Sequence, residues 1–186
     1  MRSFLLLLAL LSSCASPVPF SLVLENASDA ILYLQSNDAA PRVALEMEVD
    51  GEWQPVSTFR WAWCDRECGK PFEACPALAP EMETAWALLP GDTVRIDYDG
   101  EAWIRQGSGD LACVRRTTLS GRVRAQVCHG DSATTWQGEP VEPPDGSGPL
   151  GVGGDSEGAY PDEPTCSDLE FDLDAGEAEI RFPLGT

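Results

Sequence analysis

Residues 43 to 51 read Val43-Ala44-Leu45-Glu46-Met47-Glu48-Val49-Asp50-Gly51. The large apolar residues occupy every second position of this stretch, which is the period of a β-strand with one buried face. An Asp-Gly pair directly after such a strand favours a tight hairpin turn, and residues 53–59 supply the returning strand. The stretch therefore predicts a half-buried β-hairpin.

Short runs of the same kind recur along the sequence, separated by Gly, Pro, Asn and Asp turns at intervals of roughly 8–12 residues. A helical period is almost missing from the sequence. This pattern favours an all-β sandwich of about ten strands. The expected strands cover residues 20–25, 30–34, 43–49, 53–59, 84–89, 93–98, 102–104, 111–119, 122–128, 169–173 and 178–182.

The expected strands at 111–119 and 122–128 flank Ser120-Gly121 and allow two arrangements. A two-residue hairpin would bring Cys113 opposite Cys128 and would separate a polar face from an apolar one. In the alternative, the chain crosses between two sheets at this point, and the two cysteines lie apart. The alternation of the side chains fits both arrangements.

Two segments depart from the strand pattern. Residues 60–83 hold three cysteines and several prolines, which predicts a cysteine-rich loop. Residues 137–165 are rich in Gly, Pro and acidic residues and have few large apolar ones, so we expect a flexible insertion. After it, residues 169–173 and 178–182 flank the turn Asp174-Ala175-Gly176 and predict a final hairpin that closes the core.

The amino terminus has the features of an export signal. A positive charge at Arg2 precedes the apolar run Phe4 to Leu11, which is shorter than the ~20 residues needed to span a bilayer. The order Leu11-Ser12-Ser13-Cys14 resembles the lipobox of bacterial lipoproteins, and the resemblance implies cleavage before Cys14 and acylation of that cysteine. The alternative is an ordinary secreted protein that is cut nearby.

The resemblance to lipoproteins also bears on organisation and location. It divides the chain into a signal peptide at 1–13, a lipidated tether at 14–19 and a single β-sandwich domain at 20–186. Ala15, rather than an aspartate, follows Cys14, which by the sorting rule of enterobacteria implies an anchor in the outer membrane, on its periplasmic or cell-surface face.

Three turn-containing stretches are Leu88-Leu89-Pro90-Gly91-Asp92, Asp97-Tyr98-Asp99-Gly100 and Leu119-Ser120-Gly121-Arg122-Val123-Arg124. They resemble recurrent turns of immunoglobulin-like bacterial domains. The chain is similar to cysteine-containing lipoproteins of the myxobacterial type, a resemblance that implies an immunoglobulin-like sandwich but no activity.

The chain is strongly acidic, with 12 Lys and Arg against 31 Asp and Glu and a net charge of -19. This charge argues against nucleic acid or an anionic membrane surface as a partner. Cations or basic proteins are better candidates, although the charge could simply keep a tethered domain soluble.

The cysteines predict a disulfide framework. If Cys14 carries lipid, six cysteines remain, which is an even number in an exported domain. A zinc or copper site with His129 fits less well, because the spacings are not those of zinc-binding pairs. The six cysteines expected to form disulfides are Cys64, Cys68, Cys75, Cys113, Cys128 and Cys166.

Two acidic groups are candidates for a cation site, because calcium prefers oxygen ligands. The first consists of Asp97, Asp99 and Glu101 around Gly100. The full EF-hand pattern is missing, and a solvated strand face explains the same alternation without an ion. The second group is Asp168, Asp172 and Asp174.

Aromatic and basic residues are candidates for partner binding. Trp61 and Trp63 lie on one face of their segment and would either pack in the core or form an exposed stripe for a glycan or a protein. On the hairpin arrangement, Arg115, Arg122 and Arg124 form a basic patch, or else pair with neighbouring carboxylates.

The sequence favours a non-catalytic protein without a cofactor or a resident metal. His129 is the only histidine, and neither a nucleophile elbow nor a phosphate-binding loop is present. We therefore expect a binding or structural module that contacts another envelope protein. The alternatives are a cation- or glycan-binding lipoprotein and a protease inhibitor that uses the loop at 60–83.

Overall fold

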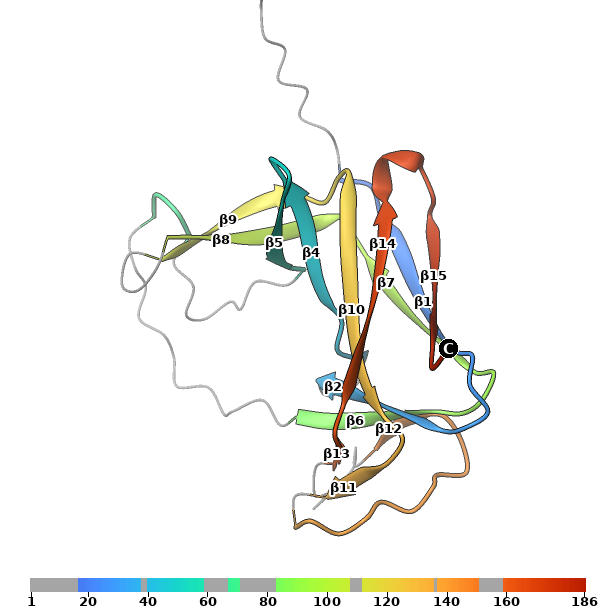
Figure 1. Ribbon diagram of the computed structural model, residues 1–186. Coiled ribbons are helices and arrows are strands. Elements are labelled where there is room, and N and C mark those ends of the chain that lie inside the picture. Colours follow the sequence, from blue (N-terminus) through green and yellow to red (C-terminus); the bar gives the residue numbers. More distant parts are fainter. Residues whose placement is uncertain are drawn as a thin grey trace, which may run out of the picture.

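The computed structural model describes residues 17–37, 40–58, 67–70, 83–107, 112–135, 137–150 and 159–186, which form an all-β sandwich (Figure 1). The predicted all-β class is confirmed. No helix in these ranges is long and apolar enough to cross a bilayer. The strands are β1 (Phe20–Asn26), β2 (Leu32–Asn37), β3 (Ala40–Pro41), β4 (Ala44–Val49), β5 (Glu52–Ser57), β6 (Glu83–Leu88), β7 (Thr93–Tyr98), β8 (Glu101–Gln106), β9 (Cys113–Thr118), β10 (Arg122–Gly130), β11 (Ala133–Thr135), β12 (Gly148–Leu150), β13 (Ala159–Pro161), β14 (Thr165–Asp172) and β15 (Glu179–Leu184).

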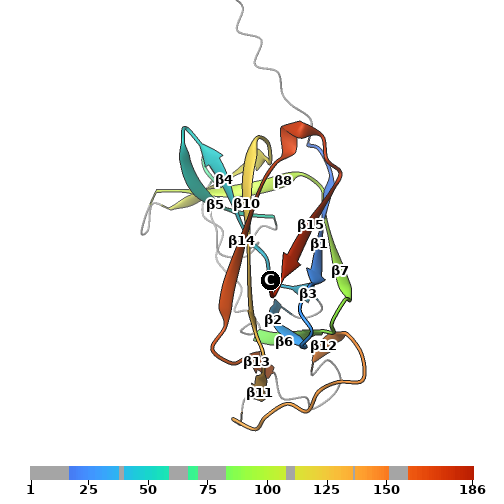
Figure 2. The same cartoon turned by 45° about the vertical axis from the view of Figure 1, so that its right-hand side comes forward.

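Most of the strands form two facing layers, which Figure 2 shows nearly edge-on, and β11 and β13 form a separate two-stranded sheet. One layer has the order β15-β1-β7, with β1 parallel to β15 and antiparallel to β7. The centre of the other layer is β14-β10-β4-β5. Its hydrogen-bonded path continues through β8 and β9 at one end and through β2, β6 and β12 at the other. The immunoglobulin-like topology remains a prediction.

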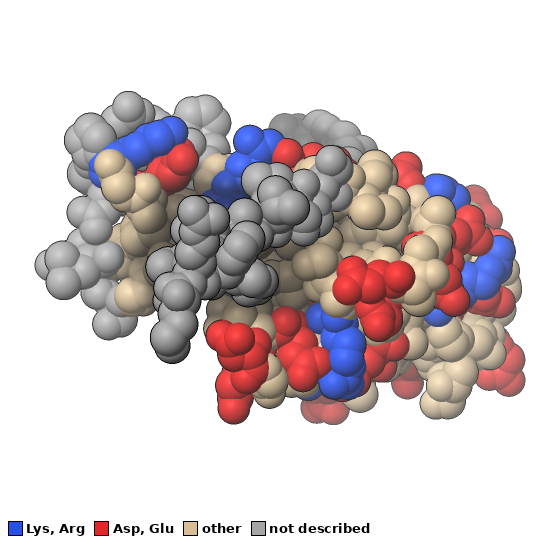
Figure 3. All heavy atoms as spheres, turned by 90° about the horizontal axis from the view of Figure 1, so that it is seen from above, with Lys and Arg blue, Asp and Glu red and all other residues tan. Residues whose placement is uncertain are grey.

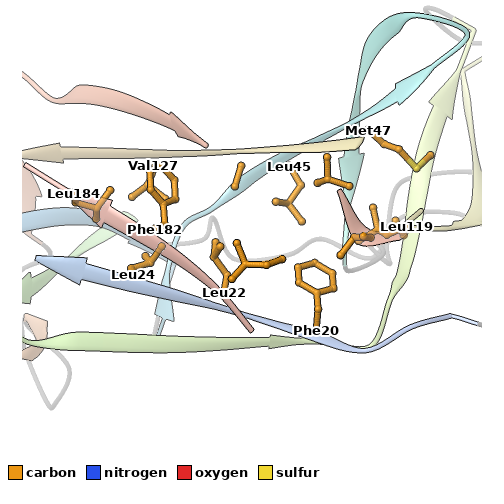
Figure 4. Packing of buried hydrophobic residues seen from close by; sticks show 14 of the residues in the cluster. Phe20, Leu22, Leu24, Leu45, Met47, Leu119, Val127, Phe182 and Leu184 are labelled. Atoms are coloured by element: carbon orange, nitrogen blue, oxygen red, sulfur yellow. The ribbon is translucent and has the colours of Figure 1, made fainter. Parts of the chain in front are cut away.

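Alternate residues of the strands form the core between the layers. Leu22 and Leu24 on β1 are completely buried, and Figure 4 shows them pointing toward the layer that contains Leu45 and Val127. Burial of a side chain of this size stabilises the folded state by about 1.5–3 kcal/mol. The alternation read from Val43 to Val49 is thus an inward-facing apolar row, with Leu45 and Met47 buried.

The predicted hairpin at Asp50-Gly51 is confirmed. β4 and β5 pair antiparallel, with Val49 opposite Glu52. Asp50 and Gly51 have φ values of 54° and 84°, and two successive left-handed residues match the twist of the flanking strands. Here the turn chemistry and the strand pattern agree, so the local sequence is sufficient.

The predicted hairpin at Ser120-Gly121 is wrong: Cys113 and Cys128 lie apart, as the alternative expected, but β9 and β10 belong to the same sheet rather than to two. β9 pairs with β8, whereas β10 pairs with β14 on one side and with β4 and then β2 on the other. Cys113 therefore bonds Cys68, and Cys128 bonds Cys166, which faces it across β10 and β14. The alternation of side chains was correct, but it does not specify the neighbouring strand.

The predicted final hairpin is also wrong, for the same reason. β14 and β15 belong to opposite layers, and the chain crosses between them through a short 3-10 turn at Leu173–Ala175. Asp172 caps this turn by accepting from the backbone N–H of Asp174, and Gly176 ends it with a φ of 79°. The apolar residues of both strands still reach the core, but from opposite sides.

The segment expected to be a flexible insertion contains the short strands β12 and β13. β12 adds to β6, and β13 pairs with β11. Val141 and Leu150 pack on a second apolar cluster that contains Tyr33, Ala87 and Ala133. The segment has few large apolar residues, but these two pack beside Tyr33 of β2 and Ala87 of β6. The backbone hydrogen bonds of β12 and β13 also attach the segment to β6 and β11.

Candidate partner-binding site

Several predicted site residues lie outside the described residues: the lipidation site Cys14, the cysteines Cys64 and Cys75, and the tryptophans Trp61 and Trp63. The same holds for most of the expected loop at 60–83. Residues 67–70 of that loop are described, and the backbone N–H of Cys68 donates to the carbonyl of Val114 on β9 (3.0 Å).

The first acidic group does not form a cation site. Asp97 Oδ1 accepts from Ser21 Oγ (2.6 Å) and from Arg95 Nε (2.9 Å), and these two hydrogen bonds lower the pKa of Asp97. Asp99 accepts from the backbone N–H of Glu101 (2.9 Å), and Glu101 itself pairs with Arg116. The three carboxylates thus have separate structural partners.

The second acidic group is divided in the same way. Asp168 accepts from Gln126 Nε2 (2.9 Å), Asp174 accepts from the backbone N–H of Gly121 (3.1 Å), and Asp172 caps the 3-10 turn. Within the part of the chain that the structure describes, no group of three or more His, Cys, Asp or Glu side chains could hold a metal ion.

His129 lies in the interior, next to the disulfide of Cys128. Its side chain is 9% exposed, and Nε2 lies 3.4 Å from Ser167 Oγ. Its Nδ1 has no hydrogen-bond partner among the described residues. Activation of a serine by a histidine requires an acceptor on the other ring nitrogen to fix the tautomer, and none of the described residues supplies one. This pairing of a serine and a histidine was not predicted, because its two members are 38 residues apart.

Burial lowers the pKa of His129, against a smaller opposing effect of Asp131. The unfolded chain therefore binds the proton more readily, and stability should fall as the pH drops below the ordinary value of about 6.5. We expect denaturant unfolding to show this loss between neutral and mildly acidic pH, and His129→Gln to remove it. An NMR titration of the only histidine in the chain with an unshifted midpoint would contradict the prediction.

The three predicted arginines do not form one patch. Arg115 lies on β9, whereas Arg122 and Arg124 lie on β10, and these strands do not pair. Arg122 donates to Glu48 (2.8 Å) and to Glu170 (2.6 Å), and Arg124 donates through Nε to Glu46 (2.7 Å). These carboxylates raise the pKa of both guanidiniums.

Trp53 is the residue of this face that sequence reasoning missed. The guanidinium carbons of Arg122 and Arg124 lie 5.4 Å and 4.9 Å from the centre of its ring. Trp53 lies opposite Glu48 in the β4–β5 hairpin, whereas the two arginines belong to β10, much farther along the chain. A regular alternation in both strands was the only signal, and it does not indicate that they share a face.

A cleft of about 830 Å³ lies between β7, at the edge of its layer, and the segment that includes β3, β4 and β5. Its apolar lining includes Val43, Val56 and Ile96, which are partly buried and pack against the core. Tyr98 also lines it and stacks on Phe20 with ring centres 4.9 Å apart, and burial raises the pKa of the tyrosine.

Charged residues also line the cleft, and one of them is Arg124, which lies over Trp53. Glu46, Asp97, Asp99 and Asp168 line the cleft together with Arg42 and Arg124. Figure 3 looks down on the end of the sandwich near the β4–β5 turn and shows acidic side chains spread over the described surface, with basic ones between them. The cleft thus combines an apolar lining with a predominantly acidic set of charges.

No protein-family model matches the chain, and neither the curated proteins nor the solved structures gave a significant match.

Proposed function

We propose that this chain is a non-catalytic binding module for another protein, held at the bacterial envelope by a lipid on Cys14. The observation that carries the proposal is the cleft beside β7, with its apolar lining and acidic charges. Apolar lining with a few placed polar groups is typical of binding sites. The acidic charges fit a basic partner, as the net charge of -19 does.

The hydrogen bonds at the cleft support a binding role rather than a catalytic one. Asp97, Asp99 and Asp168 are engaged with Ser21 and Arg95, with the backbone of Glu101, and with Gln126. A general acid or base needs a proton that substrate can reach and a pKa near the working pH. Asp97 and Asp168 instead bond side chains that face them across paired strands, and Asp99 bonds the backbone at the turn before β8.

Site-specific photo-crosslinking in the envelope tests the proposal. A photoreactive residue at Ala44 or Pro55, both exposed and both in the lining of the cleft, should form an adduct with a specific protein. The matched control is Arg181, which is exposed on β15 in the other layer. The same adducts at all three positions, or none at the cleft, would contradict the proposal.

The anchor is tested in the same cells. The Cys14→Ser variant should move from the membrane fraction to the soluble fraction and lose incorporation of labelled palmitate. If the variant stays in the membrane with its label, Cys14 is not the lipid carrier, and the proposed location is wrong while the cleft can still bind a protein.

A further inference from the structure

We propose that the cleft binds an extended, cationic segment of the partner protein, which adds to the outer edge of β7 as a further strand. This inference rests on the proposed function and specifies how the partner binds. In strand addition, the backbone of the edge strand supplies hydrogen bonds, and pockets beside it receive alternate side chains of the added segment.

The orientation of the β7 backbone follows from its pairing with β1. The N–H of Asn26 donates to the carbonyl of Asp92, and the N–H of Ser21 donates to Ala178 near β15. Backbone groups alternate sides along an antiparallel pair. The N–H and C=O groups of the even-numbered residues of β1 therefore point toward β7, and those of their partners Val94, Ile96 and Tyr98 point toward β1. The odd-numbered residues of β7 therefore direct their N–H and C=O groups away from β1.

Asp97 is the outward-directed residue of β7 at the cleft. No described strand pairs with this edge of β7. A strand edge with unpaired N–H and C=O groups is a template for another strand. The edge is also flanked by the apolar side chains of Ile96 and Val56, which can receive the alternate apolar residues of an added strand.

The charges select the occupant. Four carboxylates and two guanidiniums line the cleft. Glu46 is paired with Arg124 and Asp97 with Arg95, so the acidic surplus lies at Asp99 and Asp168. An added strand with Lys or Arg between its apolar residues would complement this surplus. A second copy of the chain is disfavoured, because two molecules with a net charge of -19 each repel one another.

A proline substitution separates the backbone of the edge from its side chain. Proline lacks an N–H and is tolerated in edge strands where that N–H points outward. Asp97→Pro and Asp97→Ala both lose the carboxylate that binds Ser21 and Arg95, but only the alanine variant keeps the N–H. Peptides selected on the purified full chain from a random-sequence display pool serve as the probe.

We expect the selected peptides to alternate apolar residues with Lys or Arg, and to bind Asp97→Pro at least about tenfold more weakly than Asp97→Ala. Their affinity should fall as salt is added. Thermal melting shows whether both variants fold. Should the proline variant fail to fold, slowed hydrogen exchange of the Asp97 amide in the wild-type chain on adding the peptide replaces it as the measurement.

The outcomes distinguish this inference from the proposed function. Equal binding of folded Asp97→Pro and Asp97→Ala, or an Asp97 amide whose exchange is unchanged, would overturn strand addition while binding at the cleft stands. Selected peptides without Lys or Arg would overturn the cationic occupant, and a dimer that Asp97→Pro dissociates would identify a second copy instead. Failure to select any peptide, together with no specific photo-crosslink, would overturn both.

Discussion

Replacing Asn26 by alanine should lower the free energy of unfolding by about 2–4 kcal/mol. Asn26 is 1% exposed at the end of β1, and its Nδ2 donates to the carbonyls of Ala30 and Leu88, both at 2.8 Å. Its Oδ1 accepts from the backbone N–H (3.0 Å) and the hydroxyl (2.7 Å) of Ser28. The substitution leaves these groups without their partner, and the Leu88 carbonyl is buried.

The matched control for this prediction is Ser28→Ala. Its hydroxyl bonds Asn26 and Ala30 at a partly exposed site, so water can replace it and the loss should stay below about 1 kcal/mol. Urea unfolding of the two variants gives both values. A loss for Asn26→Ala no larger than that for Ser28→Ala would show that the side chain of Asn26 does not join the two layers.

Removal of the Cys128–Cys166 disulfide should have an effect of similar size. The bond joins β10 to β14 across 38 residues, and on the loop-closure account a cross-link of that span contributes about 4 kcal/mol by restricting the unfolded chain. We expect Cys128→Ser with Cys166→Ser to lose about 3–4 kcal/mol in urea unfolding under oxidising conditions.

The second disulfide is the comparison. Cys68–Cys113 spans 45 residues, and the entropy of closure changes slowly with length. The Cys68→Ser, Cys113→Ser variant should therefore lose a similar amount. An unchanged midpoint for the Cys128–Cys166 variant would contradict the prediction, as would peptide mapping that links Cys113 to Cys128.

Local patterns were sufficient for the strands and for one turn. Alternation marked β7 at its observed bounds, and Asp50-Gly51 formed the expected hairpin. Each of these features depends on residues within a few positions of one another. A Gly-containing turn at Gly121 or Gly176 predicted a change of direction, but it did not predict which strand the chain would pair with after the turn. After Gly121 the chain stays in the same layer, and after Gly176 it enters the other one.

The candidate site could not be predicted from local sequence patterns. The acidic residues around Gly100 looked like a cation site, because they alternate in sequence. Two of them instead have partners elsewhere in the chain: Asp97 bonds Ser21, 76 residues before it, and Glu101 pairs with Arg116. The arginines of β10 meet Trp53 only because β4 pairs with β10. The cleft lies beside β7, which is the last strand of its layer among the described residues, and no local sequence feature determines this.

The sequence by itself determined the all-β class, the faces of most strands, the hairpin at Asp50-Gly51 and the acidic surface. Only the tertiary structure decided the neighbours of each strand, the cysteine pairs of β9 and β10, and the edge of β7 with which no described strand pairs. The physical reason is that the alternation that buries a strand face is a property of one segment. The choice of neighbour depends instead on the packing of apolar faces from distant segments, and many pairings satisfy the same alternation.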